Sequence, residues 1–214
     1  MSHTSRASEA PMGPPPHPAR AFGLDGDAMA LVIAQINRFA ANSLQQVGWE
    51  LAACGGEASD NLLRTLTQVG AMTSLHRRLS TPPRPGERIE DYCRGLCGDV
   101  VLALGRGEVR PRLAMCDTPL SCGRSLGVAI LVVELMTNAL KHGAAPREGG
   151  TVWVAMRPLC DGRLELSVSD SFAPPINPHP PRPRLIETLA HALSGELIIG
   201  VRPTYTTRIR FPVA

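Results

Sequence analysis

Four polar side chains stand at helical spacing directly behind the most apolar run of the sequence. That run, LGVAILVV at 126–133, is typical of buried core. The segment after it, ELMTNALKHG at 134–143, carries a carboxylate, an amide, an ammonium group and an imidazole. Positions i and i+4 of an α-helix share a face, and i+7 and i+8 lie near it. We therefore expect four side chains to project together: Glu134, Asn138, Lys141 and His142.

These groups suit a phosphate-bearing ligand. A carboxylate orients water or a metal, an amide oxygen is a ligand for Mg²⁺, and cations pair with phosphates. Asp170 ends a predicted strand, LELSVSD, where its carboxylate is placed to accept a hydrogen bond from an exocyclic amine. The alternative is a merely solvated polar face, which the apolar run before Glu134 disfavours because it indicates a packed helix.

Composition excludes several classes of protein. The chain has 214 residues, 43% hydrophobic, and a net charge of +3, too weak to indicate a nucleic-acid partner. The longest apolar run covers 8 residues, against about 20 for a membrane helix. No signal-peptide pattern opens the sequence, and the six cysteines form no CxxC pair. We therefore expect reduced thiols in a cytoplasmic protein with no membrane or nucleic-acid partner.

The first part of the chain predicts a tail and a helical hairpin. Residues 1–23 are rich in proline and small polar residues and read as a disordered tail. Residues 24–84 contain two helical patterns separated by a break at 55–60, and STPPRPG ends the second. An apolar stripe on the second helix would pair with another copy of the chain to form a four-helix bundle. Its residues are Leu62, Leu66, Val69, Met72, Leu75 and Leu79.

The remainder, 85–214, predicts a second domain of mixed character. Helical patterns alternate with short strands whose residues alternate between apolar and polar. One mixed sheet covered on one face by helices, an α+β sandwich, accommodates this order. The expected helices are 87–105, 124–143 and 183–195, and the expected strands are 108–116, 150–159, 162–170, 196–201 and 205–213.

These motifs, in this order, resemble histidine kinases of the HWE type within the GHKL ATPase superfamily. The segment LGVAILVVELMTNALKHG is similar to their N-box, the strongest of the matches. INRFAANSLQ at 36–45 and LTQVGAMTSLHRRLS at 66–80 resemble the two dimerisation helices. GRLELSVSD resembles the strand with the adenine-contacting aspartate, RLIETLAHALSGEL the helix after the nucleotide lid, and RIRFP the last strand.

The resemblance implies roles for the polar residues singled out above. Asn138 would hold Mg²⁺, and Asp170 would accept a hydrogen bond from the adenine amine. Glu134 would act around the γ-phosphate, and Lys141 and His142 would approach the phosphates. ATP and magnesium are the cofactors of such a site.

The family's phospho-accepting histidine is replaced. Aligning NSLQ at 42–45 with the family pattern puts Arg38 at the acceptor position. No histidine occurs between His17 and His76, so a register shift does not restore one. A guanidinium group is not nucleophilic at neutral pH and does not replace a neutral imidazole. We expect no catalytic residue at position 38.

The nucleotide loop departs from the family as well. Its Asp-x-Gly-x-Gly pattern becomes DSFAPP at 170–175, with Phe172 at the first glycine position and Pro174 at the second. The glycine-rich lid becomes PINPHPPRPR at 175–184, in which five prolines remove five backbone N–H donors. Arg182 and Arg184 would compensate by charge alone. These changes predict lost or very weak ATP binding.

The sequence thus favours a dimeric pseudokinase scaffold that binds the receiver domain of a response regulator, or a partner kinase, through Arg38 and Asn42. No cofactor is then expected. In the alternative, ATP binds through the N-box and phosphate passes to His76 or to a partner in trans, although packing is the favoured role of His76. A third interpretation, compatible with the first, has Phe172 and the proline segment filling the former nucleotide pocket.

Overall fold

The computed structural model describes residues 45, 58–81, 83–84, 86–142, 149–172, 184–200 and 206–213. Within them the chain forms an α+β fold, as predicted. The helices are α3 (Ala58–Leu79), α4 (Ile89–Ala103), α5 (Cys122–His142) and α6 (Arg184–Ala192). The strands are β1 (Arg110–Met115), β2 (Thr151–Pro158), β3 (Arg163–Asp170), β4 (Glu196–Gly200) and β5 (Thr206–Pro212).

The five strands form one mixed sheet in the order β1-β2-β3-β5-β4. β1 and β2 are parallel, with Arg110 opposite Thr151, and the remaining pairs are antiparallel. The parallel pair follows from the long connection through α5, because only a crossover returns the chain in the same direction. The predicted β2–β3 hairpin is confirmed, with Gly162 at positive φ in its turn.

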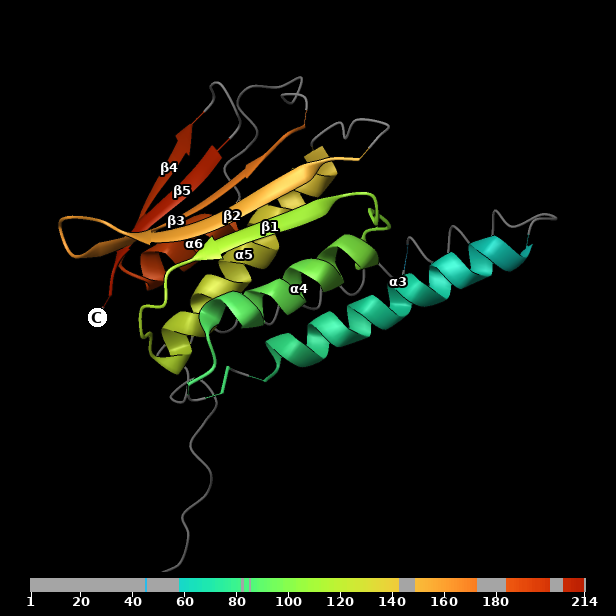
Figure 1. The fold of residues 1–214 in the computed structure, drawn as a ribbon, viewed down its shortest axis with the longest axis horizontal. Coiled ribbons are helices and arrows are strands. Elements are labelled where there is room, and N and C mark those ends of the chain that lie inside the picture. Colours follow the sequence, from blue (N-terminus) through green and yellow to red (C-terminus); the bar gives the residue numbers. More distant parts are fainter. Residues whose placement is uncertain are drawn as a thin grey trace, which may run out of the picture.

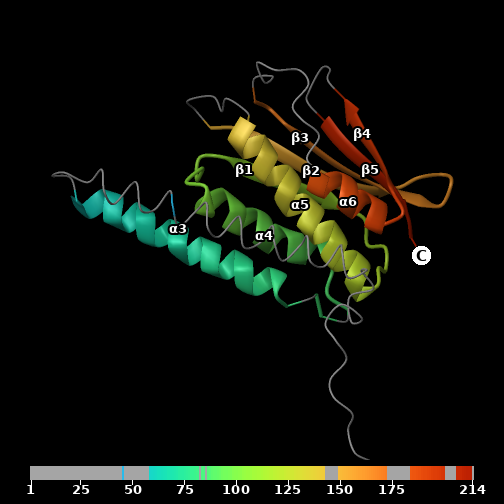
Figure 2. The same ribbon diagram turned by 180° about the vertical axis from the view of Figure 1, so that it is seen from behind.

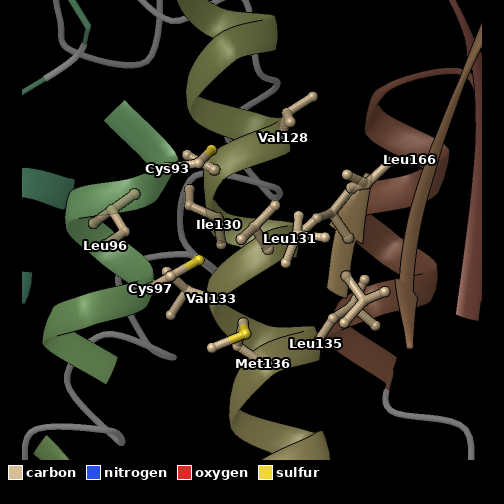
Figure 3. Packing of buried hydrophobic residues seen from close by; sticks show 14 of the residues in the cluster. Cys93, Leu96, Cys97, Val128, Ile130, Leu131, Val133, Leu135, Met136 and Leu166 are labelled. Atoms are coloured by element: carbon tan, nitrogen blue, oxygen red, sulfur yellow. The ribbon is translucent and has the colours of Figure 1, made fainter. Parts of the chain in front are cut away.

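The helices cover one face of the sheet. In Figure 1 the strands lie in front of α5 and α6, and Figure 2 shows these helices from the other side, with α4 beside α5 and α3 outermost. Inward strand residues such as Val154, Leu166 and Ile209 are buried beneath them. Figure 3 shows Ile130 of α5 on the side of α4 and Leu131 on the side of Leu166. α5 is therefore packed on two sides, which explains its long apolar run.

α5 is also the one described helix that is long and apolar enough to cross a membrane. Of its most apolar stretch, however, 72% is buried inside the structure. A central core helix meets the same criterion of length and composition, and the sheet and α4 account for the apolar side chains here.

α3 has two apolar faces, whereas the sequence predicted one stripe. Met72, Leu75 and Leu79 are buried on the side of α4 and α5, while Leu62 and Leu66 remain exposed. The two sets diverge because the apolar spacing drifts around a helix of 22 residues. The helix begins at Ala58, three residues inside the predicted break at 55–60. The first hairpin helix lies outside the described residues.

Polar contacts fasten α3 to α4. The Arg78 guanidinium pairs with Asp99 at 3.0 Å. The Tyr92 hydroxyl lies 2.8 Å from the carbonyl oxygen of Arg78 and 3.1 Å from that of Thr81, where it donates a hydrogen bond. These contacts join the end of α3 to the α/β domain.

Candidate functional site

The predicted polar face lies on the last turns of α5. Glu134 is buried at 7% exposure, Asn138 is half-buried and Lys141 is exposed. The exposure of these side chains thus increases along the helix toward its C-terminal end. The side chain of His142 lies outside the described part of the chain.

Asp170 ends β3 on the face that the helices cover. It pairs in register with Val152, which is fully buried, and is itself only 8% exposed. Its carboxylate Oδ1 accepts a hydrogen bond from the backbone N–H of Phe172 at 2.9 Å. Burial raises the pKa of Asp170, and the N–H of Phe172 offsets only part of that rise. Desolvation disfavours the charged form of a buried carboxylate and so raises its pKa. Carboxylates with such shifted pKa values are often found at functional sites.

Phe172 connects the end of β3 with the end of α5. Its ring is buried, and a Cβ atom built on Gly150 would collide with it. The guanidinium group of Arg106 lies 5.8 Å from the ring centroid, within the range of a cation–π contact. The same guanidinium donates a hydrogen bond to the carbonyl oxygen of Leu140 at 2.6 Å. These contacts bring the α5 terminus and the residue two positions after Asp170 to one end of the sheet.

The buried hydroxyl group of Thr137 indicates whether the α5 half of this site suits a polar ligand. Its hydroxyl is buried, at 4% exposure, and has no hydrogen-bond partner among the described residues. It stands three residues after Glu134 and four before Lys141, on the predicted polar face. An unpaired buried hydroxyl costs about 1–3 kcal/mol, and a ligand or water would relieve that cost. The α5 half therefore has room in its hydrogen bonding for a polar ligand, and Mg²⁺ with a nucleotide phosphate is the one that the resemblance implies.

The loop half fits a nucleotide less well. Phe172 takes the first glycine position of the family pattern and is held in the core by Gly150 and Arg106. Its own φ is not positive, so the backbone there is ordinary for a side-chain-bearing residue. The two halves of the predicted site therefore differ in how well they match the ligand that the resemblance implies.

No contact among the described residues brings the other predicted site residues to this end of the sheet. His76 is exposed on α3, and α3 packs mainly against α4. Arg38, Asn42, Arg182 and the proline segment lie outside the described residues, as do the predicted tail and the domain boundary near residue 24. Among the described residues no group of three or more His, Cys, Asp or Glu side chains is placed to hold a metal ion.

Three residues of the site were not identified from the sequence. Arg106 lies in the α4–β1 turn and Gly150 just before β2, and both meet Phe172 only through the fold, so no local signal marks them. Thr137 did carry a signal, because it stands at helical spacing from Glu134.

Comparison with known proteins identifies the fold. No protein-family model matches the sequence, and no curated protein matches it. Among solved structures, the blue-light activated histidine kinase EL346 of Erythrobacter litoralis is similar, with a TM-score of 0.54 and 16% identity. That match covers 85% of this chain and 60% of the kinase, so this chain spans less than two thirds of the kinase's length.

The histidine kinase domain of the same Erythrobacter litoralis protein gives a TM-score of 0.52 at 18% identity, over 88% of this chain and 95% of the domain. At these identities the similarity establishes the fold. The chain therefore shares its fold with the histidine kinase domain of that protein.

Proposed function

We propose that this protein is a degenerate histidine-kinase-like component of a two-component pathway. It acts as a dimeric scaffold or regulator that binds a receiver domain or a partner kinase, and it does not itself carry a phosphate on a histidine of the first hairpin helix. The proposal rests on Phe172, buried under Arg106 at the position where the family pattern has its first loop glycine. Phe172 changes the nucleotide loop and Arg38 replaces the phosphate acceptor, so both the donor side and the acceptor side of phosphate transfer are altered in a chain that keeps the fold.

Arg38 supplies the proposed contact to the partner. A receiver domain presents carboxylates where it takes phosphate from a phosphohistidine, and a guanidinium group pairs with a carboxylate through two parallel hydrogen bonds. Calorimetry with a panel of receiver domains tests this role. Arg38→Ala should weaken binding about tenfold, whereas Arg64→Ala, an exposed arginine on α3 with no ion pair among the described residues, should not. Equal affinity of the Arg38→Ala and parent chains would remove Arg38 from the interface.

Dimerisation has support from α3. Leu62, Leu63 and Leu66 are exposed large apolar side chains on one helix, and an apolar patch of this kind marks an interaction surface. In the proposed assembly they face the first hairpin helix and a second copy. Sedimentation equilibrium should give a dimer for the parent chain and a monomer for Leu62→Glu/Leu66→Glu. A monomeric parent chain would contradict the four-helix bundle.

The alternative is an ATP-dependent kinase that passes phosphate to His76 or to a partner in trans. It is favoured by the unpaired Thr137 hydroxyl, the buried Asp170 and the exposed side chain of His76. Titration with Mg²⁺-ATP separates the two functions. Micromolar affinity that is abolished by Asn138→Ala would overturn the pseudokinase proposal, and incorporation of γ-phosphate that is lost in His76→Ala would identify the acceptor.

Chemical labelling of Lys141 provides a second, independent test of nucleotide binding. Lys141 is the only lysine in the sequence and its side chain is exposed. An acyl-phosphate derivative of ATP, which acylates a lysine beside the bound phosphates, should label Lys141 efficiently only if the nucleotide binds there. Under the scaffold proposal, labelling should be slow and unaffected by excess ATP. Labelling that ATP competes away would support the enzyme.

A further inference from the structure

The face of the sheet that points away from the helices is rich in arginine. No described helix covers it, and Figure 1 views the molecule from this side. Strand residues alternate between faces, and the register places six arginines on this outer face. They are Arg110, Arg112, Arg157, Arg163, Arg208 and Arg210. The outer face and its adjoining turn provide three carboxylates: Glu165, Glu196 and Asp161.

Half of these guanidinium groups already have partners. Arg157 and Arg210 both pair with Glu165, at 2.7 and 2.9 Å. Arg163 pairs with Asp161 at 2.7 Å and approaches Glu196 at 3.9 Å. The other three make no ion pair or hydrogen bond through their side chains with any described residue. These unpaired arginines are Arg110, Arg112 and Arg208.

An exposed tryptophan lies among the unpaired arginines. Trp153 is 43% exposed and stands in register beside Arg112 on β1 and Ser169 on β3. The next row across the sheet holds Ala114, Ala155 and Ser167, then Arg208 on β5 and Ile198 on β4. Three of these neighbours have small side chains, in keeping with the 43% exposure of the indole. Tryptophan and arginine are the residues most enriched at interaction hot spots.

The β1 edge of the sheet is poorly suited to strand addition. In the parallel pair, Arg110 and Cys116 donate their N–H groups to β2, so the backbone N–H groups of the odd-numbered residues of β1 point to the free edge. Pro111 has no N–H, and the N–H of Met115 donates to the Glu90 carboxylate at 3.0 Å. A partner therefore finds few free N–H groups along β1 and meets the face of the sheet instead of the β1 edge.

We propose that this outer face, defined by Arg110, Arg112, Trp153 and Arg208, binds an acidic segment of a partner protein. Carboxylates of that segment pair with the three free guanidinium groups, and one apolar side chain packs on the indole of Trp153. A nucleic acid fits the surface less well, because single-stranded binding platforms stack successive bases on several aromatic rings. The described outer face presents one. This surface is distinct from the nucleotide-like site at the end of α5.

Fluorescence of Trp153 reports binding directly. The sequence has two tryptophans, Trp49 and Trp153, so the full chain carrying Trp49→Phe emits from Trp153 alone. The probe is a synthetic peptide of glutamates with one central phenylalanine. We expect a saturable change in emission that weakens as salt is raised. Absence of a saturable change, with the chain folded by circular dichroism, would overturn the proposal.

Variants locate the binding surface. Arg112→Glu/Arg208→Glu should weaken peptide binding by about tenfold or more, because attraction becomes repulsion at two positions. The matched control is Arg64→Glu/Arg77→Glu, which reverses two exposed arginines on α3 with no ion pair among the described residues and should leave the affinity unchanged. Equal losses in both variants would show attraction to overall charge only and overturn the proposal. Tighter binding of an oligonucleotide of the same charge would assign the surface to nucleic acid and overturn it too.

Discussion

The ring of Phe172 occupies the space that a side chain at Gly150 would need. Their proximity joins the second residue after the end of β3 to the residue before β2. Gly150 does not adopt a positive φ, so its lack of a side chain is explained by packing and not by backbone conformation. The substitution of Phe172 for the loop glycine of the family pattern therefore has a matching small residue opposite it.

We predict that Gly150→Ala destabilises the fold through this collision. Overpacking of this kind costs about 1–3 kcal/mol, and Phe172→Ala should cost about 3–5 kcal/mol by leaving a cavity. In the double variant the methyl group added at Gly150 enters the space vacated by Phe172. The loss in free energy of unfolding should therefore be well below the sum of the losses in the two single variants. Urea denaturation of the four chains measures the coupling. Strict additivity would mean that Gly150 and Phe172 do not share this space.

The described fold was predictable because its strands and helices carry strong periodic signals. Leu164, Leu166 and Val168 alternate with more polar residues and are buried as expected. Glu165 breaks that rule, since it points to the outer face and is still only 2% exposed. Arg157 and Arg210 cover it from the two neighbouring strands. Such burial depends on residues far apart in sequence, and no pattern within one strand reports it.

The candidate site was predictable in its helix and less so in its surroundings. Glu134 and Asn138 follow from helical spacing, and Asp170 from its place at the end of a strand. Arg106 was not predictable, because it reaches the carbonyl oxygen of Leu140 across 34 residues of sequence. On α3 the apolar spacing itself drifts around the helix, but which of the two sets is buried depends on where α4 packs, and this the sequence does not show.

Asp170 should make the protein less stable as the pH rises. Its folded pKa is raised by burial, so the folded state holds this proton more tightly than the unfolded chain. Its contribution to stability is then present below the unfolded pKa, about 3.9, and is lost as the pH rises through the folded value. Asp170→Asn removes the buried charge while its side-chain oxygen still accepts from the N–H of Phe172. We expect it to stabilise the fold at neutral pH by about 0.5–2 kcal/mol.

Thermal unfolding at several pH values checks the Asp170 prediction. The difference between parent and variant should shrink as the pH falls toward the unfolded pKa of the carboxyl. Asp161→Asn is the matched control, because Asp161 is exposed and pairs with Arg163 in a turn. Destabilisation of Asp170→Asn at neutral pH would mean that the carboxylate is better stabilised than its burial implies.

Tyr92 should stabilise the packing of α3 against α4 up to strongly alkaline pH. Burial raises its pKa to about 12, above the unfolded value of about 10. The stability it contributes is therefore intact below the unfolded pKa and is lost as the pH rises through the folded one. Tyr92→Phe removes the donor to the carbonyl oxygens of Arg78 and Thr81 and should cost about 1 kcal/mol. Hydrogen exchange should then quicken at the end of α3, while exchange in β3 stays unchanged.

Glu165 should hold the outer face together only while it is ionised. Burial alone would raise its pKa, but hydrogen bonds from Arg157 and Arg210 outweigh that effect and hold the pKa below its usual range. Its contribution is therefore present above the unfolded pKa, about 4.3, and is lost as the pH falls through the lower folded value.

Glu165→Gln should destabilise the fold at neutral pH by about 1–2 kcal/mol, below the 3–5 kcal/mol of a deeply buried pair, because Arg157 is 67% exposed and water screens it. Urea denaturation at neutral and acid pH should show the gap to the parent chain closing as the acid range is entered. Glu196→Gln is the control, since Glu196 is exposed and lies 3.9 Å from Arg163. Equal effects of the two variants would mean that the pairing of Glu165 with two arginines adds nothing beyond an ordinary surface charge.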